Sequence, residues 1–249
     1  AYRFTRPDIN FNPKEAMNLL MSFNKVDTAA LKNKKQVSSF DILSQIMPPI
    51  TLKYKTKLFE DEEEYSKSNN VLEIVAGKYV RGQMEKGVFG GGGKGLLQRI
   101  CNYYGNMASA DFVDNLQNVV TEYMKTSAYS VGISDLIADK DTNEKIAQTI
   151  TTKKKDVKNL IDQTHLGIFE NKTGKSNEEE FETQVTNILN NATNEAGKIG
   201  RKSLDQDNRF IIMVNAGSKG SDINISQMIS CLGQQTVDGK RIPYGFENR

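Results

Sequence analysis

Two long amphipathic helical patterns in the second half of the chain limit its fold more than any other feature. The first begins at a capping pattern formed by Asp141 and Glu144 and continues to about Gly167, and the second begins at Ser176 with Glu179. Apolar residues in the second recur three and four positions apart: Phe181, Val185, Ile188, Leu189, Ala192, Ala196 and Ile199. A short polar connection joins the two patterns, which therefore predict an antiparallel helical hairpin with arms of roughly 35 Å.

Each of these helices offers one narrow apolar seam. The pair can pack along that seam while the outer faces remain polar, as in a short coiled coil. We therefore expect a projecting arm. Two helices packed inside an ordinary bundle are the alternative that the pattern leaves open.

The first half of the chain mixes short helices with strands. The predicted elements are a capped helix from Asn12 to about Asn24, a short helix over 42–46, and strands over 51–59, 71–75 and 79–84. From Asp111 onward the pattern is almost wholly helical. The predicted fold class is α+β: mainly helical, with a small antiparallel β-sheet in the N-terminal half followed by a long helical hairpin. We divide the chain at residues 38 and 105, into segments 1–38, 39–105 and 106–249.

A glycine run lies between the last predicted strand and a predicted helix over 96–104. Gly90, Gly92 and Gly95 satisfy the GxGxxG spacing of a dinucleotide-binding loop. The chain lacks the repeated strand–helix units of such folds, and Gly95 stands where a Walker loop has Ser or Thr. We interpret the run as a flexible strand-to-helix turn and reject a nucleotide-binding enzyme.

Composition excludes several classes of function. His165 is the single histidine, which rules out a Ser/His/Asp triad and a histidine metal site within the chain. Cys101 and Cys231 are far apart and lack a CxxC partner, so we expect two buried small apolar residues. The formal charge of +2 indicates no strong net field for nucleic acid. No apolar run reaches the length of a membrane span, and we expect an intracellular, soluble protein.

Residues 208–249 are rich in glycine and uncharged polar groups. Glycines 217, 220, 233 and 239 mark places where the backbone turns sharply or approaches another group closely. Uncharged hydrogen-bonding groups lie between them: Ser221, Asn224, Ser226, Gln227, Gln234 and Gln235. Such a segment is expected to face a partner.

Within this region, AGSKGSDINISQ and GQQTVDGKRIPYGF resemble the stretch leading to the bridge helix in the largest subunit of eukaryotic-type multisubunit DNA-directed RNA polymerases. Further resembling blocks occur in the order that this family requires: SFDILSQIMPP, VLEIVAGKYVRGQMEKGVFG with GKGLLQRICNYYG, YSVGISDLIADKDT, and FETQVTNILNNATNEAGKIG. The resemblance spans residues 39–249. It implies a pore-like α/β domain over 39–105, a funnel-like helical domain over 106–249, and a helical lead-in before them.

The resemblance implies a pore and funnel fragment that lines the route for nucleoside triphosphates, extruded RNA 3′ ends and transcript-cleavage factors in DNA-templated transcription. The family's NADFDGD loop, which holds the catalytic magnesium, is not in this sequence. We therefore expect an inactive fragment of a nucleotidyltransferase, with magnesium and structural zinc elsewhere in the full enzyme. Asp135, Asp139 and Asp141 are instead expected to be capping and turn residues. Expected partners are the other polymerase subunits, including the second-largest, a cleavage factor, the DNA template and RNA.

The resemblance also assigns roles to residues. Lys219 matches the position near the triphosphate of the incoming nucleotide, where a point charge neutralises phosphate. The residues expected to face the bridge helix and trigger loop are Gly220, Ser221, Asn224, Ser226, Gln227, Gln234 and Gln235. Local capping or loop stabilisation is the open alternative for the Asn and Gln residues. Lys240 and Arg241 are expected to meet nucleic acid or a neighbouring subunit.

Three residues of the predicted second hairpin helix resemble the amatoxin-contacting pattern of sensitive family members. Leu189 and Asn190 match it, whereas Thr193 stands where those members carry Arg. Because Thr lacks the guanidinium fork, reduced amatoxin affinity is expected.

A free-standing helical adaptor, which docks a partner through its hairpin, is the alternative function from a different class. The abundance of Lys and Asn suggests an AT-rich genome, and the block GKYVRGQMEKGVFGGGGKGLLQRI resembles the polymerases of large DNA viruses more than nuclear enzymes. The expected location is then the host cytoplasm or the virion, and the nucleus for a cellular enzyme. The missing initial Met and the abrupt C-terminus are those expected of a piece of a longer protein.

Overall fold

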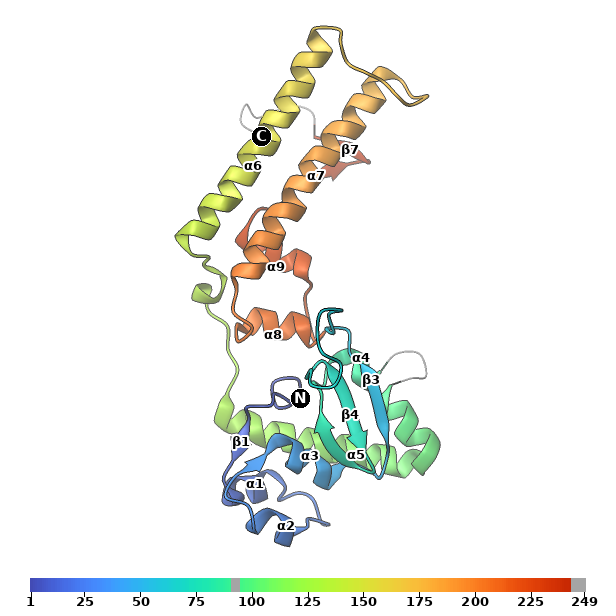
Figure 1. Cartoon of the computed structure of the whole chain (residues 1–249), viewed down its shortest axis with the longest axis vertical. Coiled ribbons are helices and arrows are strands. Elements are labelled where there is room, and N and C mark those ends of the chain that lie inside the picture. Colours follow the sequence, from blue (N-terminus) through green and yellow to red (C-terminus); the bar gives the residue numbers. More distant parts are fainter. Residues whose placement is uncertain (91–94, 243–249) are drawn as a thin grey trace. The chain divides into compact units, whose positions relative to one another are not determined.

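The computed structural model describes residues 1–90 and 95–242 and divides into two compact units (Figure 1). The first unit comprises residues 1–130 and 212–219, and the second comprises residues 131–211 and those from 220 onward. The first unit continues beyond the predicted boundary at residue 105, because Phe112, Leu116 and Tyr123, which follow a helix break at Gly105, are buried in the same core as the preceding elements. Each unit is described separately.

The first unit combines short helices with a small antiparallel sheet and ends in a long helix. Its elements before α8 are β1 (Asn10–Phe11), α1 (Pro13–Leu19), α2 (Thr28–Lys32), β2 (Val37–Ser38), α3 (Ser39–Ile46), β3 (Leu52–Lys55), β4 (Val71–Val75), β5 (Lys78–Arg81), α4 (Lys86–Phe89) and α5 (Leu96–Ser127). The predicted α+β class is confirmed.

The start of α1 follows the predicted capping chemistry. The Asn12 side chain accepts a hydrogen bond from the Glu15 backbone N–H at 2.8 Å, and the Glu15 carboxylate accepts one from the Asn12 N–H at 3.0 Å. The helix ends at Leu19, earlier than the predicted end near Asn24. The apolar pattern continues past that point, but Met21 is 80% exposed and contributes little burial.

Strands β3, β4 and β5 form an antiparallel sheet in that order. On its outer face, the Glu73 carboxylate binds the Lys53 ammonium at 2.9 Å and the Arg81 guanidinium at 2.8 Å. Two lysines of β3 also meet aromatic rings: the Lys53 ammonium lies 5.4 Å from the centre of the Tyr65 ring, and the Lys55 ammonium lies 4.2 Å from that of Phe59. The ladder at β3 covers residues 52–55, fewer than the 51–59 predicted. The Thr56 N–H still donates to the Asn70 carbonyl at 2.9 Å, and the chain turns from residue 57 onward.

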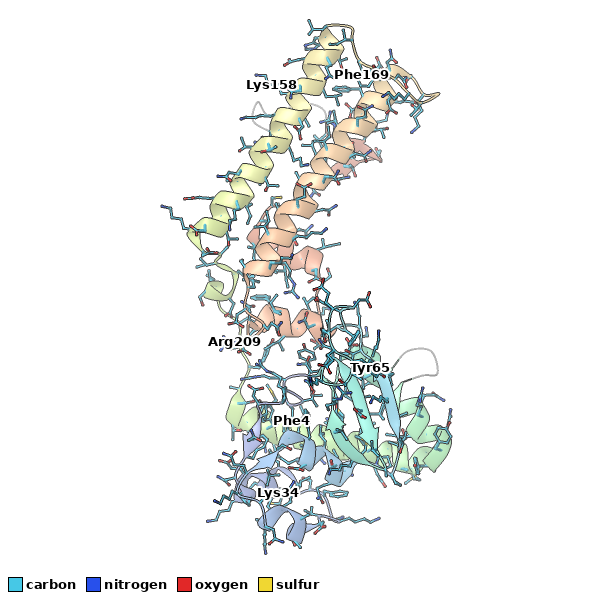
Figure 2. The ribbon with its side chains drawn as sticks, in the orientation of Figure 1. Phe4, Lys34, Tyr65, Lys158, Phe169 and Arg209 are labelled. Carbon is cyan, nitrogen blue, oxygen red and sulfur yellow. The ribbon has the colours of Figure 1, made fainter. Side chains whose placement is uncertain are left out.

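Large apolar side chains fill the centre of the first unit. Ile42 and Leu43 of α3, Ile74 of β4 and Leu96 of α5 are fully buried together. Phe4 packs against the edge of the Tyr123 ring at a centroid distance of 5.1 Å (Figure 2). This core joins the N-terminal helices, one face of the sheet and α5 into one body.

Helix α5 carries an apolar stripe along its second part and is broken at Gly105. Phe112, Leu116, Val119 and Tyr123 are buried along its second part. Gly105 has φ 88° and ψ 170°, a conformation that interrupts the helix and that glycine adopts without a Cβ clash. The break divides α5 into two helical stretches, one on each side of Gly105.

The second unit is dominated by the predicted helical hairpin. Its elements are η1 (Ile133–Leu136), α6 (Lys140–His165), α7 (Asn177–Ser203), α9 (Asp222–Ile229), β6 (Thr236–Val237) and β7 (Lys240–Arg241), and α8 (Arg209–Asn215) runs from this unit into the first. Helices α6 and α7 lie side by side and antiparallel (Figure 1). At the hairpin tip, Phe169 and Phe181 are in ring contact at 6.2 Å (Figure 2).

The caps of the two hairpin helices were predicted with different success. Ser176 caps α7 by accepting a hydrogen bond from the Glu179 backbone N–H at 3.2 Å, as predicted. The N-cap of α6 is Asp139, and the prediction of Asp141 is wrong. Asp141 lies in the first turn instead, where its negative charge still favours the helix N-terminus.

The hairpin seam is narrow. Ile146 and Leu160 of α6 are buried with Val185, Ala192 and Ala196 of α7. The Lys153 ammonium and the Glu195 carboxylate bridge the two helices at 3.1 Å. Within the described part of the chain, no helix has both the length and the apolar character needed to cross a lipid bilayer.

Candidate functional site

The C-terminal segment, defined here as residues 220–242, runs antiparallel along α7. Its contacts with α7 advance toward the start of that helix as the segment itself advances. They pair Asp222 with Arg201, Ser226 with Gly197, Ser230 with Ala196 and Gly200, Gly233 with Thr193, and Arg241 with Glu182. The predicted residues Ser226 and Thr193 therefore lie at the contact between this segment and α7.

Two glycines of α7 allow α9 to approach closely. A Cβ atom at Gly197 would lie 2.6 Å from the Ser226 Oγ and 2.8 Å from its Cβ. A Cβ atom at Gly200 would lie 2.6 Å from the Ser230 Oγ, which donates a hydrogen bond to the Ala196 carbonyl at 2.9 Å. Neither glycine was singled out from the sequence. Their spacing of three residues beside the apolar stripe of α7 could have indicated a close helix contact.

Ser221, Asn224 and Ser226 have local partners. The Asn224 side-chain oxygen accepts hydrogen bonds from both the N–H and the hydroxyl of Ser221 at 2.9 Å, which forms a capping box at the start of α9. The Ser226 hydroxyl donates to the Asp222 carbonyl at 2.9 Å and faces Gly197. These three polar groups stabilise the segment, which matches the alternative left open for Asn224.

Gln234 presents a different environment. Its side-chain oxygen is buried, and it has no hydrogen-bond partner among residues 1–90 and 95–242. An unpaired buried acceptor is unfavourable unless a donor reaches it. Gln227 is half-buried on α9, and Gln235 is exposed immediately before β6.

The predicted inhibitor-site residues lie beside this segment. A Cβ atom at Gly233, whose φ is 82°, would lie 2.7 Å from the Thr193 hydroxyl. Thr193 also donates to the Leu189 carbonyl one turn earlier, at 3.4 Å. The structure thus brings Thr193 of α7 against the residue that precedes Gln234.

Lys219 is the last residue of the first unit and lies on an anchored turn. The Lys86 backbone N–H donates to the Ala216 carbonyl at 2.9 Å, and Gly217, with φ 69°, leaves no room for a Cβ beside the Lys86 side chain. Gly220 follows with φ 76°. Lys219 is exposed, and no carboxylate of the described residues pairs with its ammonium. The turn therefore presents a fixed backbone with a free cation.

Lys240 and Arg241 behave differently from each other. The Arg241 guanidinium makes a bidentate pair with the Glu182 carboxylate, with Nε to Oε2 at 2.8 Å and Nη2 to Oε1 at 2.9 Å. The hydrogen bond from Arg241 lowers the pKa of Glu182, and the same bond raises the pKa of Arg241. Lys240 is exposed. Arg241 is thus engaged within the chain, whereas Lys240 remains open to a partner.

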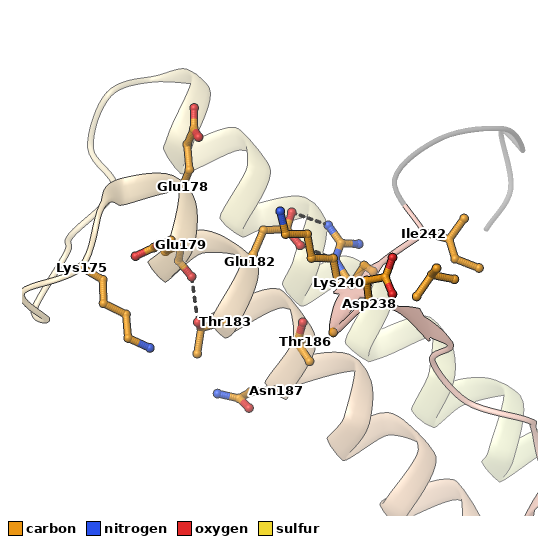
Figure 3. A pocket seen from close by; sticks show the side chains of 13 residues that line it. Lys175, Glu178, Glu179, Glu182, Thr183, Thr186, Asn187, Asp238, Lys240 and Ile242 are labelled. Atoms are coloured by element: carbon orange, nitrogen blue, oxygen red, sulfur yellow. Dashed lines mark hydrogen bonds and ion pairs between the residues drawn. The ribbon is translucent and has the colours of Figure 1, made fainter.

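A cavity of about 1150 Å³ separates the β6–β7 hairpin from the first half of α7 (Figure 3). Glu178, Glu179 and Glu182 line it from α7, and Asp238 and Lys240 line it from the hairpin. Figure 3 shows Glu182 facing the hairpin, joined to it by the dashed line of its pair with Arg241.

The clustered aspartates are confirmed as capping and turn residues in two cases. The Asp135 carboxylate accepts a hydrogen bond from the Gly132 N–H at 2.9 Å, and Asp139 is the N-cap of α6. A hydrogen bond from the Thr142 side chain lowers the pKa of Asp139. Across the described ranges, no group of three or more His, Cys, Asp or Glu side chains gathers in a geometry suited to a metal ion.

Two other sequence predictions can be compared with the structure. Cys101 and Cys231 are free thiols but only half-buried, so the prediction of two buried residues is wrong. Cys101 lies in α5 shortly before the break at Gly105, and Cys231 follows the C-cap of α9. The glycine run interpreted as a turn falls largely on residues 91–94, outside the described residues.

Comparison with known protein families identifies the chain. The family described as RNA polymerase Rpb1, domain 3, matches residues 1–136, and the family described as RNA polymerase Rpb1, domain 4, matches residues 160–249. The first match alone covers more than half of the chain, and the two follow each other in domain order. The free-standing adaptor is accordingly not favoured. The chain belongs to the family of the largest subunit of multisubunit DNA-directed RNA polymerase, of which it carries segments of domains 3 and 4, and its partners are other subunits of that enzyme.

Proposed function

We propose that this chain forms the pore and funnel beneath the active centre of its RNA polymerase. In this role it lines the route taken by nucleoside triphosphates, extruded RNA 3′ ends and transcript-cleavage factors. The observation that carries the proposal is the pair of consecutive matches to domains 3 and 4 over residues 1–136 and 160–249. The catalytic aspartates and magnesium belong, in this proposal, to other parts of the enzyme, as does structural zinc.

Lys219 is the residue proposed to meet nucleotide phosphate. A passage for polyanions needs cations that are exposed and not neutralised by neighbouring carboxylates. Lys219 meets both conditions among the described residues, and the Lys86 to Ala216 hydrogen bond fixes the backbone shortly before it. The ammonium of Lys219 would there place a positive charge beside the negative charge of the phosphates.

Gln227, Gln234 and Gln235 are proposed to face the bridge helix and trigger loop. The unpaired buried oxygen of Gln234 supports this role, because a donor from another element of the polymerase would satisfy it. Ser221, Asn224 and Ser226 contribute indirectly, since their hydrogen bonds shape α9. Gly220 supplies the turn before that helix.

Replacing Lys219 tests the proposed phosphate contact. In the assembled polymerase, Lys219→Ala should raise the nucleotide KM roughly ten-fold, because one charge-assisted contact contributes ~1.5 kcal/mol. Single-nucleotide addition measured across nucleotide concentrations gives this value. Lys14→Ala, which removes another exposed lysine, is the matched control. An unchanged KM and elongation rate for Lys219→Ala would refute the contact.

We further propose that the parent enzyme binds amatoxin weakly. Thr193 occupies the position where sensitive family members carry Arg, and Thr cannot offer a bidentate donor. Thr193→Arg should therefore strengthen inhibition of transcription by about ten-fold, for a charge-assisted bond of ~1.5 kcal/mol. Equal inhibition of the parent and variant enzymes would show that this position does not control affinity.

Origin and location are part of the proposal. The resemblance of the block GKYVRGQMEKGVFGGGGKGLLQRI to the polymerases of large DNA viruses supports such a virus as the source. For such a source we propose the host cytoplasm or the virion as the location, and the nucleus for a cellular enzyme. The second-largest subunit and a transcript-cleavage factor are the specific partners proposed, together with template DNA and RNA.

A further inference from the structure

The β6–β7 hairpin has few attachments to the rest of the second unit. Its strands pair with each other over Thr236–Val237 and Lys240–Arg241, through a turn with Asp238 at φ 50° and Gly239 at φ 74°. Most of its described residues are exposed, and the cavity separates it from α7. Ordinary apolar packing therefore does little to fix the hairpin.

The Glu182–Arg241 pair supplies the directional contact between the hairpin and α7. Two parallel N–H to oxygen bonds at 2.8 Å and 2.9 Å fix both the distance and the orientation of the guanidinium. The Arg241 side chain is 26% exposed and that of Glu182 is 50% exposed. A bidentate pair that is partly shielded on one side constrains a hairpin better than a single exposed contact.

Gln234 and Gln235 lie between this pair and a second anchor. Gly233 packs against Thr193 of α7, and Arg241 binds Glu182, which is eleven positions nearer to the start of the same helix. That separation corresponds to roughly 16 Å of helix. The chain from Gly233 to Arg241 is thus held at both ends against one rigid element, with the two glutamines directly after the first anchor.

We propose that Glu182 is a positioning residue: it holds Arg241 on α7 and thereby sets the hairpin and the Gln234–Gln235 segment. The consequence for transcription rests on the proposed function, in which these glutamines face moving elements of the polymerase. Glu182 itself touches neither nucleotide nor RNA in this account. It acts through Arg241, and its effect should follow the charge pairing rather than the identity of either residue.

The test uses the assembled polymerase carrying variants of this chain. Glu182→Gln should speed backbone amide exchange across residues 234–242 about two- to five-fold, the range expected for a partly exposed ion pair. Glu178→Gln, which neutralises another carboxylate of the same cavity, should leave exchange unchanged. The double variant Glu182→Arg with Arg241→Glu should restore slow exchange, whereas Glu182→Arg alone should not. Unchanged exchange in Glu182→Gln, or failure of the swapped pair to restore it, would overturn the proposal.

Elongation kinetics separate this proposal from the proposed function. Glu182→Gln should lower the maximal elongation rate while leaving the nucleotide KM unchanged, because Lys219 is untouched. The swapped pair should recover that rate. Faster exchange with normal elongation would confirm the positioning by Glu182 and contradict the role of the glutamines in elongation. If Lys219→Ala leaves the nucleotide KM unchanged while Glu182→Gln speeds amide exchange, only the phosphate contact is contradicted.

Discussion

The two units of this chain are stabilised by different interactions. The first unit buries large side chains such as Phe4, Ile74 and Phe112 in one continuous core. The second unit buries one narrow seam, and several of its buried positions along α7 are alanine or glycine. The first unit resembles an ordinary globular domain in its energetics, whereas the second relies on close helix contact and individual polar links. Such a helical unit exposes much of its surface to neighbouring elements of an assembly.

This difference predicts that one core deletion affects the first unit more than any change tested in the second. Leu43→Ala should lower the free energy of unfolding by about 3 kcal/mol, because Leu43 is fully buried and its loss leaves a cavity. Denaturant unfolding of the chain measures this value. Met21→Ala, at an 80% exposed position, is the control and should change it by less than ~0.5 kcal/mol. If both variants lower the free energy of unfolding by a similar small amount, the first unit is not stabilised mainly by its core, and the contrast between the two units fails.

The close packing of α9 on α7 predicts a smaller effect in the second unit. Gly197→Ala should lower the free energy of unfolding by about 1 kcal/mol. The added methyl group overpacks the contact at a cost of ~1 to 3 kcal/mol, which exceeds the gain in helix propensity of up to ~1 kcal/mol. Ser226→Gly should rescue it, because both clashing atoms belong to Ser226. Gly174→Ala has open space around its Cβ and is the control. If denaturant unfolding shows that Gly197→Ala is stabilising, α9 can move away from α7 at no cost, and the close contact is contradicted.

The smallest expected change in the free energy of unfolding is the loss of the Glu182–Arg241 pair, which occurs at acid pH. The pKa of Glu182 is lowered in the folded chain from its ordinary value of 4.5. The pair's contribution to the free energy of unfolding is therefore fully present above pH 4.5. The contribution is lost as the pH falls through the lowered pKa, and it amounts to less than ~1 kcal/mol for a half-exposed group. The charged groups facing the pair are Lys175, Glu178, Glu179, Asp238 and Lys240.

Nuclear magnetic resonance can follow this titration directly. The Arg241 Nε–H signal should keep its position from pH 7 to about 5 and then move toward that of free arginine as Glu182 is protonated. In Glu182→Gln the signal should lie near the free position throughout. A signal that moves in the same way in both chains would mean that another carboxylate causes the change.

The sequence predicted features that depend on neighbouring residues. The capping box of Asn12 and Glu15, the Ser176 cap and the antiparallel hairpin all follow from local chemistry and helical periodicity. The choice between Asp139 and Asp141 failed because both carry the same capping chemistry two positions apart. The predicted strands were recognisable, but the end of β3 depends on where its partner strand stops.

Features that depend on distant residues could not be predicted in the same way. The path of residues 220–242 along α7 depends on the fit of Gly197 and Gly200 to two serines. The pairing of Arg241 with Glu182 joins residues far apart in the chain, and either could have paired with several other charges. The family resemblance predicted which residues belong to the site, while the structure added the helix α7 along which the C-terminal segment lies.

The proposed location of Lys219 can be tested most directly by cross-linking from that position. A photoreactive amino acid at residue 219 of the assembled polymerase should attach to a nucleoside triphosphate in a paused elongation complex, and to the RNA 3′ end after backtracking. The same group at residue 14 should attach to neither. Cross-links from residue 219 exclusively to protein, with nucleotide bound and the enzyme active, would contradict the placement of this turn on the nucleotide route.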